Sequence, residues 1–219
     1  MRVVYLHGFA SSPASSKATF LERQFTRAGI PFYCPNLNEP DFSTLTTSRM
    51  VEQVVNLVDG LGAGRVVLFG SSLGAFVALC VANKAPAPIR HVIDALVLLA
   101  PALDFGQRPI GDLGLKGMTR WRDTGWWEFN HHAYGKPRRV HYELFRDAAS
   151  YDTFAIGGEI PTLILQGSHD SIVDPMMATR FAKENSSVKL VMLDDDHQLS
   201  ASLDRIWSES AQFLALTRR

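Results

Sequence analysis

The fold is decided by residues 66–79, which read VVLFGSSLGAFVAL. The first four residues are apolar, with β-branched and aromatic members, as in a buried strand, and residues 75–79 are apolar as in a buried helix. Between them stands Gly-x-Ser-x-Gly, with Ser72 bracketed by Gly70 and Gly74. A serine at the apex of a sharp strand-to-helix turn takes strained backbone angles, and small neighbours let the chain approach itself. The stretch therefore predicts a nucleophile elbow with Ser72 at its apex.

The neighbouring Ser71 lacks this bracketing, because Phe69 and Leu73 occupy the same offsets. We therefore predict Ser72 as the nucleophile and Ser71 as a structural neighbour. The alternative is a tight turn without catalytic role. It is the weaker interpretation, because the motif stands between an apolar strand and an apolar helix.

Outward from this stretch, short apolar runs alternate with longer segments of helical period. This alternation is typical of a parallel sheet covered on both faces by helices. We predict a doubly wound α/β fold with a mostly parallel sheet of about six strands. The predicted strands span residues 2–6, 31–35, 65–69, 95–99, 162–166 and 188–193. The predicted helices span residues 16–28, 45–61, 73–83, 175–184 and 199–216.

The alternation stops between residues 104 and about 159, a stretch too long for a plain connection. We expect one domain over residues 1–219, with residues 104–159 as a helical lid insertion. This insertion contains four aromatic candidates for substrate contacts: Trp121, Trp126, Trp127 and Tyr134. An equally weighted interpretation is that these aromatic residues only pack the insertion onto the sheet.

The composition excludes several classes of protein. The 22 Lys and Arg residues balance 22 Asp and Glu residues, so the basic excess typical of nucleic-acid binding is missing. Cys34 and Cys80 suit neither a disulfide framework nor a four-ligand zinc site, so we expect free thiols and no metal. No apolar run reaches the ~20 residues of a membrane span, and the apolar run at the amino terminus is too short for a signal peptide. We therefore expect a cytoplasmic protein.

A serine hydroxyl is a weak nucleophile near neutral pH. It needs a histidine base, and the histidine needs a carboxylate that fixes its tautomer. His197 follows the last predicted strand and is our predicted base. Asp170 follows the strand at 162–166 and is our predicted acid. Asp104, after the strand at 95–99, is the alternative acid, because a carboxylate there can also reach the histidine.

A tetrahedral intermediate needs two backbone N–H donors that form an oxyanion hole. Leu73, directly after Ser72, is predicted to supply one of them. Phe9, in the turn after the opening strand, is predicted to supply the other. His7 in the same turn is predicted to brace the loop rather than to act as an acid or base.

The order Ser72, Asp170, His197 resembles that of the α/β-hydrolase superfamily, and the similarity extends along essentially the whole chain. More narrowly, residues 6–13 with Ser16-Lys17-Ala18, and residues 70–74, resemble the small bacterial esterases of the YqiA type. The resemblance implies an acyl-ester hydrolase with its triad on these three residues and without metal or organic cofactor. In comparison with larger hydrolases, we expect the leading antiparallel hairpin to be absent and the sheet to be short at that edge.

These features predict a serine carboxylesterase that acts on small, uncharged acyl esters through an acyl-enzyme. One alternative is a thioesterase or other acyl hydrolase with the same triad. Lys136, Arg138 and Arg139 could bind a phosphate-bearing thioester, although a solvated charged face is their more usual meaning. The other alternative is a catalytically silent binding protein. We expect a small-molecule ester as the partner, and neither nucleic acid nor a membrane; the sequence predicts no oligomeric state.

Overall fold

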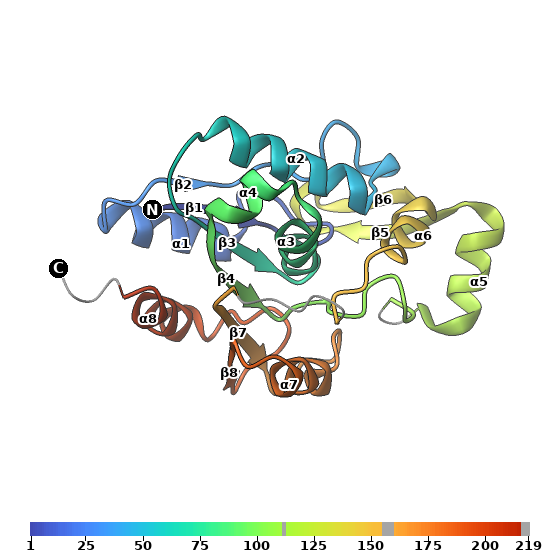
Figure 1. Cartoon of the computed structure of the whole chain (residues 1–219). Coiled ribbons are helices and arrows are strands. Elements are labelled where there is room, and N and C mark those ends of the chain that lie inside the picture. Colours follow the sequence, from blue (N-terminus) through green and yellow to red (C-terminus); the bar gives the residue numbers. More distant parts are fainter. Residues whose placement is uncertain (111–112, 155–159, 216–219) are drawn as a thin grey trace.

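Figure 1 shows the computed structural model of the chain, which describes residues 1–110, 113–154 and 160–215. Among these residues, the main sheet has six strands in the order β2-β1-β3-β4-β7-β8, and every neighbouring pair is parallel. The strands are β1 (Arg2–Leu6), β2 (Phe32–Tyr33), β3 (Val66–Ser71), β4 (Ile93–Leu99), β7 (Thr162–Gly167) and β8 (Val188–Leu193). The predicted α/β fold with a parallel sheet is confirmed.

The strand order reverses between β1 and β3. From β1 the chain moves outward to β2 at the edge, and then returns to β3 on the other side of β1. In open α/β sheets, ligands bind at the carboxyl ends of the strands beside such a reversal. Leu6 pairs with Gly70 here. The loop after β1 and the turn after β3 therefore begin side by side.

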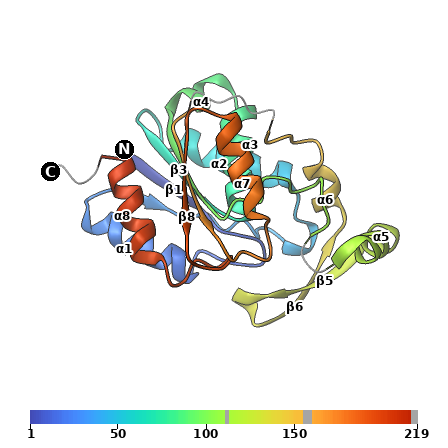
Figure 2. The same cartoon turned by 90° about the horizontal axis from the view of Figure 1, so that it is seen from below.

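Helices cover both faces of the sheet (Figures 1 and 2). One face is covered by α1 (Ser16–Arg27) and α8 (Leu203–Phe213), and the other by α2 (Thr47–Gly60), α3 (Leu73–Lys84), α4 (Ala87–Val92) and α7 (Pro175–Glu184). Successive strand residues alternate between the two faces. Val67 and Phe69 pack in the cluster of α1, whereas Val66 and Leu68 pack in that of α2 and α3. Burial on both faces explains why the strands read as continuous apolar runs.

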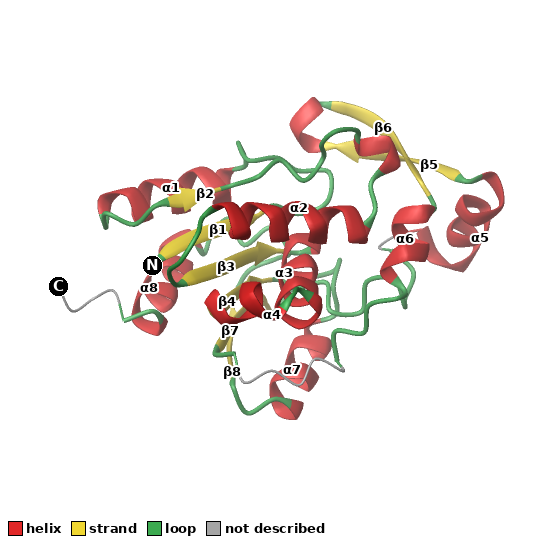
Figure 3. Ribbon diagram, turned by 45° about the horizontal axis from the view of Figure 1, so that its top comes forward, coloured by secondary structure: helices red, strands yellow, loops and turns green. Residues whose placement is uncertain are grey.

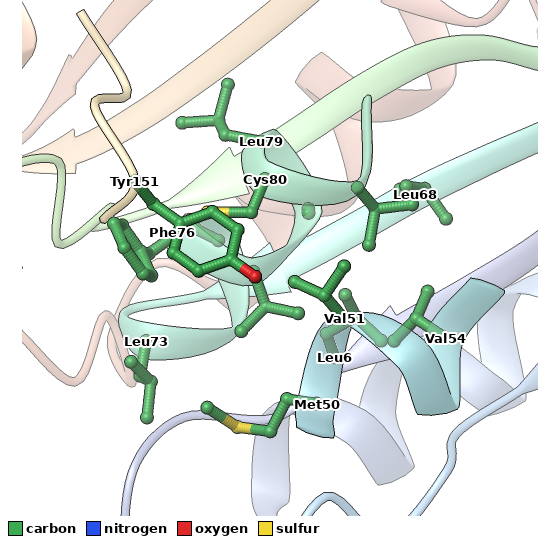
Figure 4. Packing of buried hydrophobic residues seen from close by; sticks show 14 of the residues in the cluster. Leu6, Met50, Val51, Val54, Leu68, Leu73, Phe76, Leu79, Cys80 and Tyr151 are labelled. Atoms are coloured by element: carbon green, nitrogen blue, oxygen red, sulfur yellow. The ribbon is translucent and has the colours of Figure 1, made fainter. Parts of the chain in front are cut away.

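Helix α3 is apolar on every side because it is buried on every side. All ten residues from Leu73 to Ala82 are buried. Figure 4 shows Phe76 and Cys80 of this helix among side chains of the surrounding elements, next to Tyr151. The rings of Phe76 and Tyr151 meet edge to face with centroids 6.4 Å apart. This packing fixes the amino-terminal end of α3, where Ser72 lies.

The element limits differ from the prediction at both ends of the sheet. Strand β2 keeps only two residues of the predicted 31–35. The helix predicted at 199–216 begins at Leu203, because Leu199 has a φ of 53° and interrupts the helical path. Its predicted end at residue 216 lies outside the described residues. Helix α4 was not predicted because six residues are too few for a periodic signal.

The insertion is helical only in part. Its described part contains α5 (Gly114–Thr124), β5 (Trp126–His131), the short 3-10 helix η3 (His132–Tyr134), β6 (Lys136–His141) and α6 (Glu143–Ala148). Residues 111–112 and 155–159 lie outside the described part. Strands β5 and β6 form an antiparallel hairpin that projects from the main sheet (Figures 2 and 3). Exposure alternates residue by residue along β5, and Gly135 turns the chain with a φ of 63°. This period of two is the pattern of a strand, and it corrects the helical prediction.

Candidate active site

Ser72 stands at the turn from β3 into α3, and its backbone is strained. Its φ of 53° and ψ of −115° lie outside the regions that residues with a side chain ordinarily occupy. The Ser72 amide donates to the carbonyl of Leu99 at 2.9 Å, and the Ser72 carbonyl accepts from the amide of Ala75 at 3.0 Å. Hydrogen bonds on both sides thus hold the strained turn.

The two glycines of the motif are required by close main-chain contacts. A Cβ atom added at Gly70 would lie 2.4 Å from the Cα atom of Ala75. One added at Gly74 would lie 2.1 Å from the carbonyl oxygen of Leu6 in β1. Because both partners are backbone atoms, no side-chain rotation relieves the contact.

Replacement of Gly74 by alanine is expected to lower the free energy of unfolding by about 3 kcal/mol, because α3 and β1 must move apart. Urea denaturation measures the change. Gly60→Ala is the matched control, since a Cβ atom there meets nothing within 4 Å. Equal unfolding midpoints for the two variants would contradict the close approach of α3 to β1.

The side chains of Ser72, His197 and Asp170 form a continuous hydrogen-bonded series. The Oγ atom of Ser72 lies 3.0 Å from Nε2 of His197, a contact between residues 125 positions apart. The Nδ1 atom of His197 lies 2.8 Å from Oδ2 of Asp170. The three residues follow β3, β8 and β7, so parallel strands deliver them to one edge of the sheet.

The Asp170 carboxylate is held by several donors. Beside His197, the Gln166 amide group donates to Oδ2 at 2.9 Å, and the main-chain amides of residues 172–173 donate to Oδ1 at 2.9 Å. Burial raises the pKa of this carboxyl, yet the bonds from His197 and the two amides bring the pKa below its ordinary value. An ionised carboxylate only accepts hydrogen bonds. Nδ1 of His197 therefore carries a proton, and in the neutral ring it is Nε2 that has the lone pair on the side of the Ser72 hydroxyl.

The alternative acid, Asp104, is engaged elsewhere in the site. Its carboxylate pairs with the guanidinium of Arg108 at 3.2 Å, whereas Nδ1 of His197 is bonded to Asp170. The geometry favours Asp170 over Asp104 as the partner of the histidine. Asp174 has a structural role, since its side chain caps α7 by accepting from the Met176 amide at 2.9 Å.

Two backbone amides flank the nucleophile. Leu73 opens α3, where the first amides have no partner inside the helix. Phe9 follows β1, and Gly8 before it approaches Ser72 so closely that an added Cβ atom would lie 3.5 Å from the Cβ atom of Ser72. Within the described residues, neither amide donates to another main-chain group. Both amides thus have no main-chain acceptor of their own in that part of the chain, and their role as the pair of oxyanion donors stays a prediction.

His7 braces the turn that carries Phe9. Its Nε2 atom accepts from the Leu37 amide at 3.0 Å, so the proton resides on Nδ1, which donates to the Gly8 carbonyl at 2.9 Å. Burial lowers the pKa of His7 and keeps the ring neutral. This contact ties the turn to the loop after β2, in agreement with the predicted bracing role.

A cavity of about 720 Å³ opens beside Ser72 and His197. The cavity is lined by both apolar and polar side chains. The apolar lining includes Phe9, Leu73, Phe105, Pro109, Ile110 and Val173. The polar lining includes five residues from the start of α1 and the loop before it: Ser11, Ser12, Ser15, Ser16 and Lys17. Such a volume suits a small organic molecule.

The four aromatic residues predicted as lid candidates do not line this cavity. Trp121 is fully buried, and its ring nitrogen donates to the Val140 carbonyl at 2.9 Å. Trp126 packs edge-on against His141, Tyr134 stacks on His131, and the Arg120 guanidinium lies 5.8 Å from the Trp127 ring. These contacts are all with other residues of the insertion, whereas the alternative interpretation had the four residues packing the insertion onto the sheet. The insertion reaches the cavity instead through Asp104, Phe105, Arg108, Pro109, Ile110, His132 and Ala133.

The sequence prediction assigned no role to Gln166 or Lys17. Gln166 is fully buried in β7, and its side chain donates to the Asp170 carboxylate. The sequence did offer a signal for Gln166: it is the one amide side chain in the strand at 162–166, and it stands four residues before Asp170. Lys17 belongs to the motif Ser16-Lys17-Ala18, but its contact with the loop after β8 depends on the tertiary structure.

Three further features bear on the expectations from composition. Cys34 and Cys80 are free thiols. Over residues 1–110, 113–154 and 160–215, no three His, Cys, Asp or Glu side chains gather where they could hold a metal ion. No helix in the same ranges combines the length and the apolarity needed to cross a bilayer.

The sequence from residue 2 to residue 214 matches the Uncharacterised protein family UPF0227. Among curated proteins, none matches significantly. Similar solved structures include a protein from Agrobacterium vitis S4, with a TM-score of 0.83 and 23% identity over 97% of this chain and 87% of the other. Est1E from Butyrivibrio proteoclasticus with ferulic acid bound has a TM-score of 0.78 and 17% identity, over 98% and 90%. A monoacylglycerol lipase from Paleococcus ferrophilus has a TM-score of 0.78 and 16% identity, over 98% and 94%. Because the UPF0227 match extends from residue 2 to residue 214, the chain belongs to that family. The similar solved structures show that its fold is that of the α/β hydrolases.

Proposed function

We propose that the protein is a serine hydrolase that cleaves esters of small, uncharged carboxylic acids. The observation that carries this proposal is the hydrogen-bonded series from Ser72 through His197 to Asp170, whose first two members line a cavity of about 720 Å³. A serine hydroxyl bonded to the lone pair of a neutral imidazole is prepared to lose its proton as it attacks.

In the first half of the reaction, the Ser72 oxygen attacks the ester carbonyl carbon while Nε2 of His197 takes the hydroxyl proton. The amides of Leu73 and Phe9 donate to the oxygen that becomes negatively charged. The tetrahedral intermediate collapses, the bond to the alcohol oxygen breaks, and His197 returns the proton to the leaving alcohol. Water then attacks the acyl-enzyme by the same route and releases the acid and Ser72.

Asp170 is assigned the role of holding His197 in the correct tautomer. Its charge also stabilises the imidazolium that forms during the attack. The strained backbone of Ser72 suits the nucleophile, because an elbow presents the hydroxyl beside the first amide of the following helix.

The cavity lining supports an uncharged acyl group. Phe9, Ile110 and Val173 offer apolar surface beside the nucleophile. Among the structural relatives, one is named a monoacylglycerol lipase and another binds ferulic acid, a carboxylic acid. Both names agree with chemistry on acyl compounds.

The thioesterase alternative receives less support from the structure. Arg138 and Arg139 lie on the projecting hairpin, where their guanidinium groups stack on Tyr134 and Trp126 at 4.9 and 4.5 Å. Neither arginine, nor Lys136 beside them, lines the cavity. These cations are therefore not placed to bind a phosphate group of a substrate in this cavity.

A substrate series tests the proposal. Para-nitrophenyl esters of two to ten acyl carbons and the matching acyl-coenzyme A thioesters are compared by kcat/KM. We expect hydrolysis of the oxygen esters, with a larger kcat/KM than for the thioesters of the same chain length. Folded protein that cleaves none of the esters, or that prefers the thioesters, would overturn the proposal.

A further inference from the structure

Lys17, in the first turn of α1, reaches the loop that carries His197. Its ammonium group donates to the carbonyl of Gln198 at 2.6 Å, a contact between residues 181 positions apart. Gln198 directly follows His197, and both of them line the same cavity as Lys17. This contact joins the amino-terminal part of the fold to the residue next to the predicted base.

The loop from Asp194 to Leu199 has other directional contacts on both sides of the histidine. The Asp194 carboxylate lies 3.4 Å from Nδ1 of His169. On the side before the histidine, the Asp195 carbonyl accepts from the His169 amide at 3.1 Å. The Gln198 amide donates to the Asp196 side chain at 2.7 Å. Both residues belong to the loop, so this bond shapes the loop but does not join it to another element. Leu199 is buried, but apolar packing does not fix the direction of a carbonyl. On the side after the histidine, the Leu199 carbonyl accepts from the nearby Ser202 amide at 3.3 Å. Among the described residues, the Lys17 ammonium is the group from a distant part of the chain that bonds to a loop carbonyl on this side.

The electrostatic surroundings suit a lysine that binds this loop. Burial lowers the pKa of Lys17 to about 8, against the opposing influence of three carboxylates. Two of them, Asp195 and Asp196, belong to the loop itself, and the third is Asp170 in the loop after β7. The other cation of the cavity, Arg108, pairs with Asp104 instead. The Lys17 charge thus faces the carboxylates around His197.

We propose that Lys17 is a positioning residue whose ammonium group holds the Gln198 carbonyl and so keeps the His197 imidazole between Asp170 and Ser72. The inference rests on the proposed hydrolase function. It assigns Lys17 to the loop and not to the substrate. A misplacement of about 1 Å in a catalytic group can lower a rate roughly 100-fold, so a single tether of this kind has a measurable effect.

Steady-state kinetics on a neutral ester tests the assignment. Lys17→Met is expected to lower kcat roughly 10- to 100-fold with a change in KM of less than about twofold. Lys17→Arg should recover part of the loss, because a guanidinium also donates to a carbonyl. Lys183→Met, at an exposed lysine of α7, is the matched control. An unchanged kcat for Lys17→Met, or a loss confined to KM, would overturn the proposal, since the latter marks a substrate contact.

The pH profile gives a second readout. Above pH 8 the wild-type ammonium loses its charge and bonds the carbonyl more weakly, so kcat should fall. This fall should be missing from Lys17→Arg, because a guanidinium stays protonated throughout that range. The same fall in both proteins would count against Lys17 as its source.

A spectroscopic readout separates this inference from the proposed function. The Nδ1 proton of His197, bonded to Asp170, should give a downfield proton resonance in the wild type that broadens or disappears in Lys17→Met. Circular dichroism checks that the variant is folded. If the wild type hydrolyses no ester but the resonance depends on Lys17, only the proposed function fails. A resonance unchanged by Lys17→Met would refute the positioning role whatever the activity.

Discussion

Replacement of Ser72 by alanine is expected to lower kcat for a short-chain para-nitrophenyl ester by roughly 10⁵- to 10⁶-fold. The substitution removes the oxygen that lies 3.0 Å from Nε2 of His197 and would form the acyl-enzyme. The fold should persist, because the Ser72 side chain does not cap α3. Initial rates at saturating substrate measure the loss.

The matched control is Ser208→Ala, at an exposed serine of α8, which should retain the wild-type rate. A thermal melt of each variant shows whether it is folded. Folded Ser72→Ala with more than about one hundredth of the wild-type kcat would contradict the assignment, because a nucleophile cannot be removed at so small a cost.

The second large effect concerns the acid. Asp170→Asn should lower kcat roughly 10⁴-fold, because an asparagine amide can donate to Nδ1 and so favour the tautomer with the proton on Nε2. That tautomer cannot accept the proton of the Ser72 hydroxyl. The change is nearly isosteric, so the loss reports on the tautomer more than on packing.

Asp104→Asn provides the comparison for this prediction. Asp104 lines the same cavity, but it pairs with Arg108 and not with His197. We expect a loss of less than about tenfold in kcat, typical of a residue outside the hydrogen-bonded series. The reverse order of effects would identify Asp104 as the acid and would require the His197 loop to rearrange.

The fold and the polar centre of the site could be predicted because their signals are local. The strand, the Gly-x-Ser-x-Gly turn and the apolar helix are adjacent in the chain, and the steric demand at Ser72 leaves its mark on Gly70 and Gly74. Asp170 and His197 follow parallel strands, and parallel strands bring their carboxyl ends to one edge. The chain order therefore sufficed to predict that the three residues meet.

The walls of the cavity could not be predicted in the same way. A tryptophan in an insertion suits a substrate contact or a local core equally well, and only the tertiary structure decides. Trp121 is buried within the insertion, whereas Ile110 lines the cavity. The contact of Lys17 with Gln198 likewise depends on how α1 packs beside the last loop, which no local pattern encodes.

The central claim is that Ser72 is an activated nucleophile, and labelling with a fluorophosphonate probe tests it most directly. The probe reacts with an activated serine and needs no knowledge of the substrate. We predict stoichiometric labelling of the wild type at Ser72, located by mass spectrometry of the peptides, and none in His197→Ala. Folded wild-type protein that stays unlabelled, or that is labelled at another residue, would contradict the claim and would favour a silent binding protein.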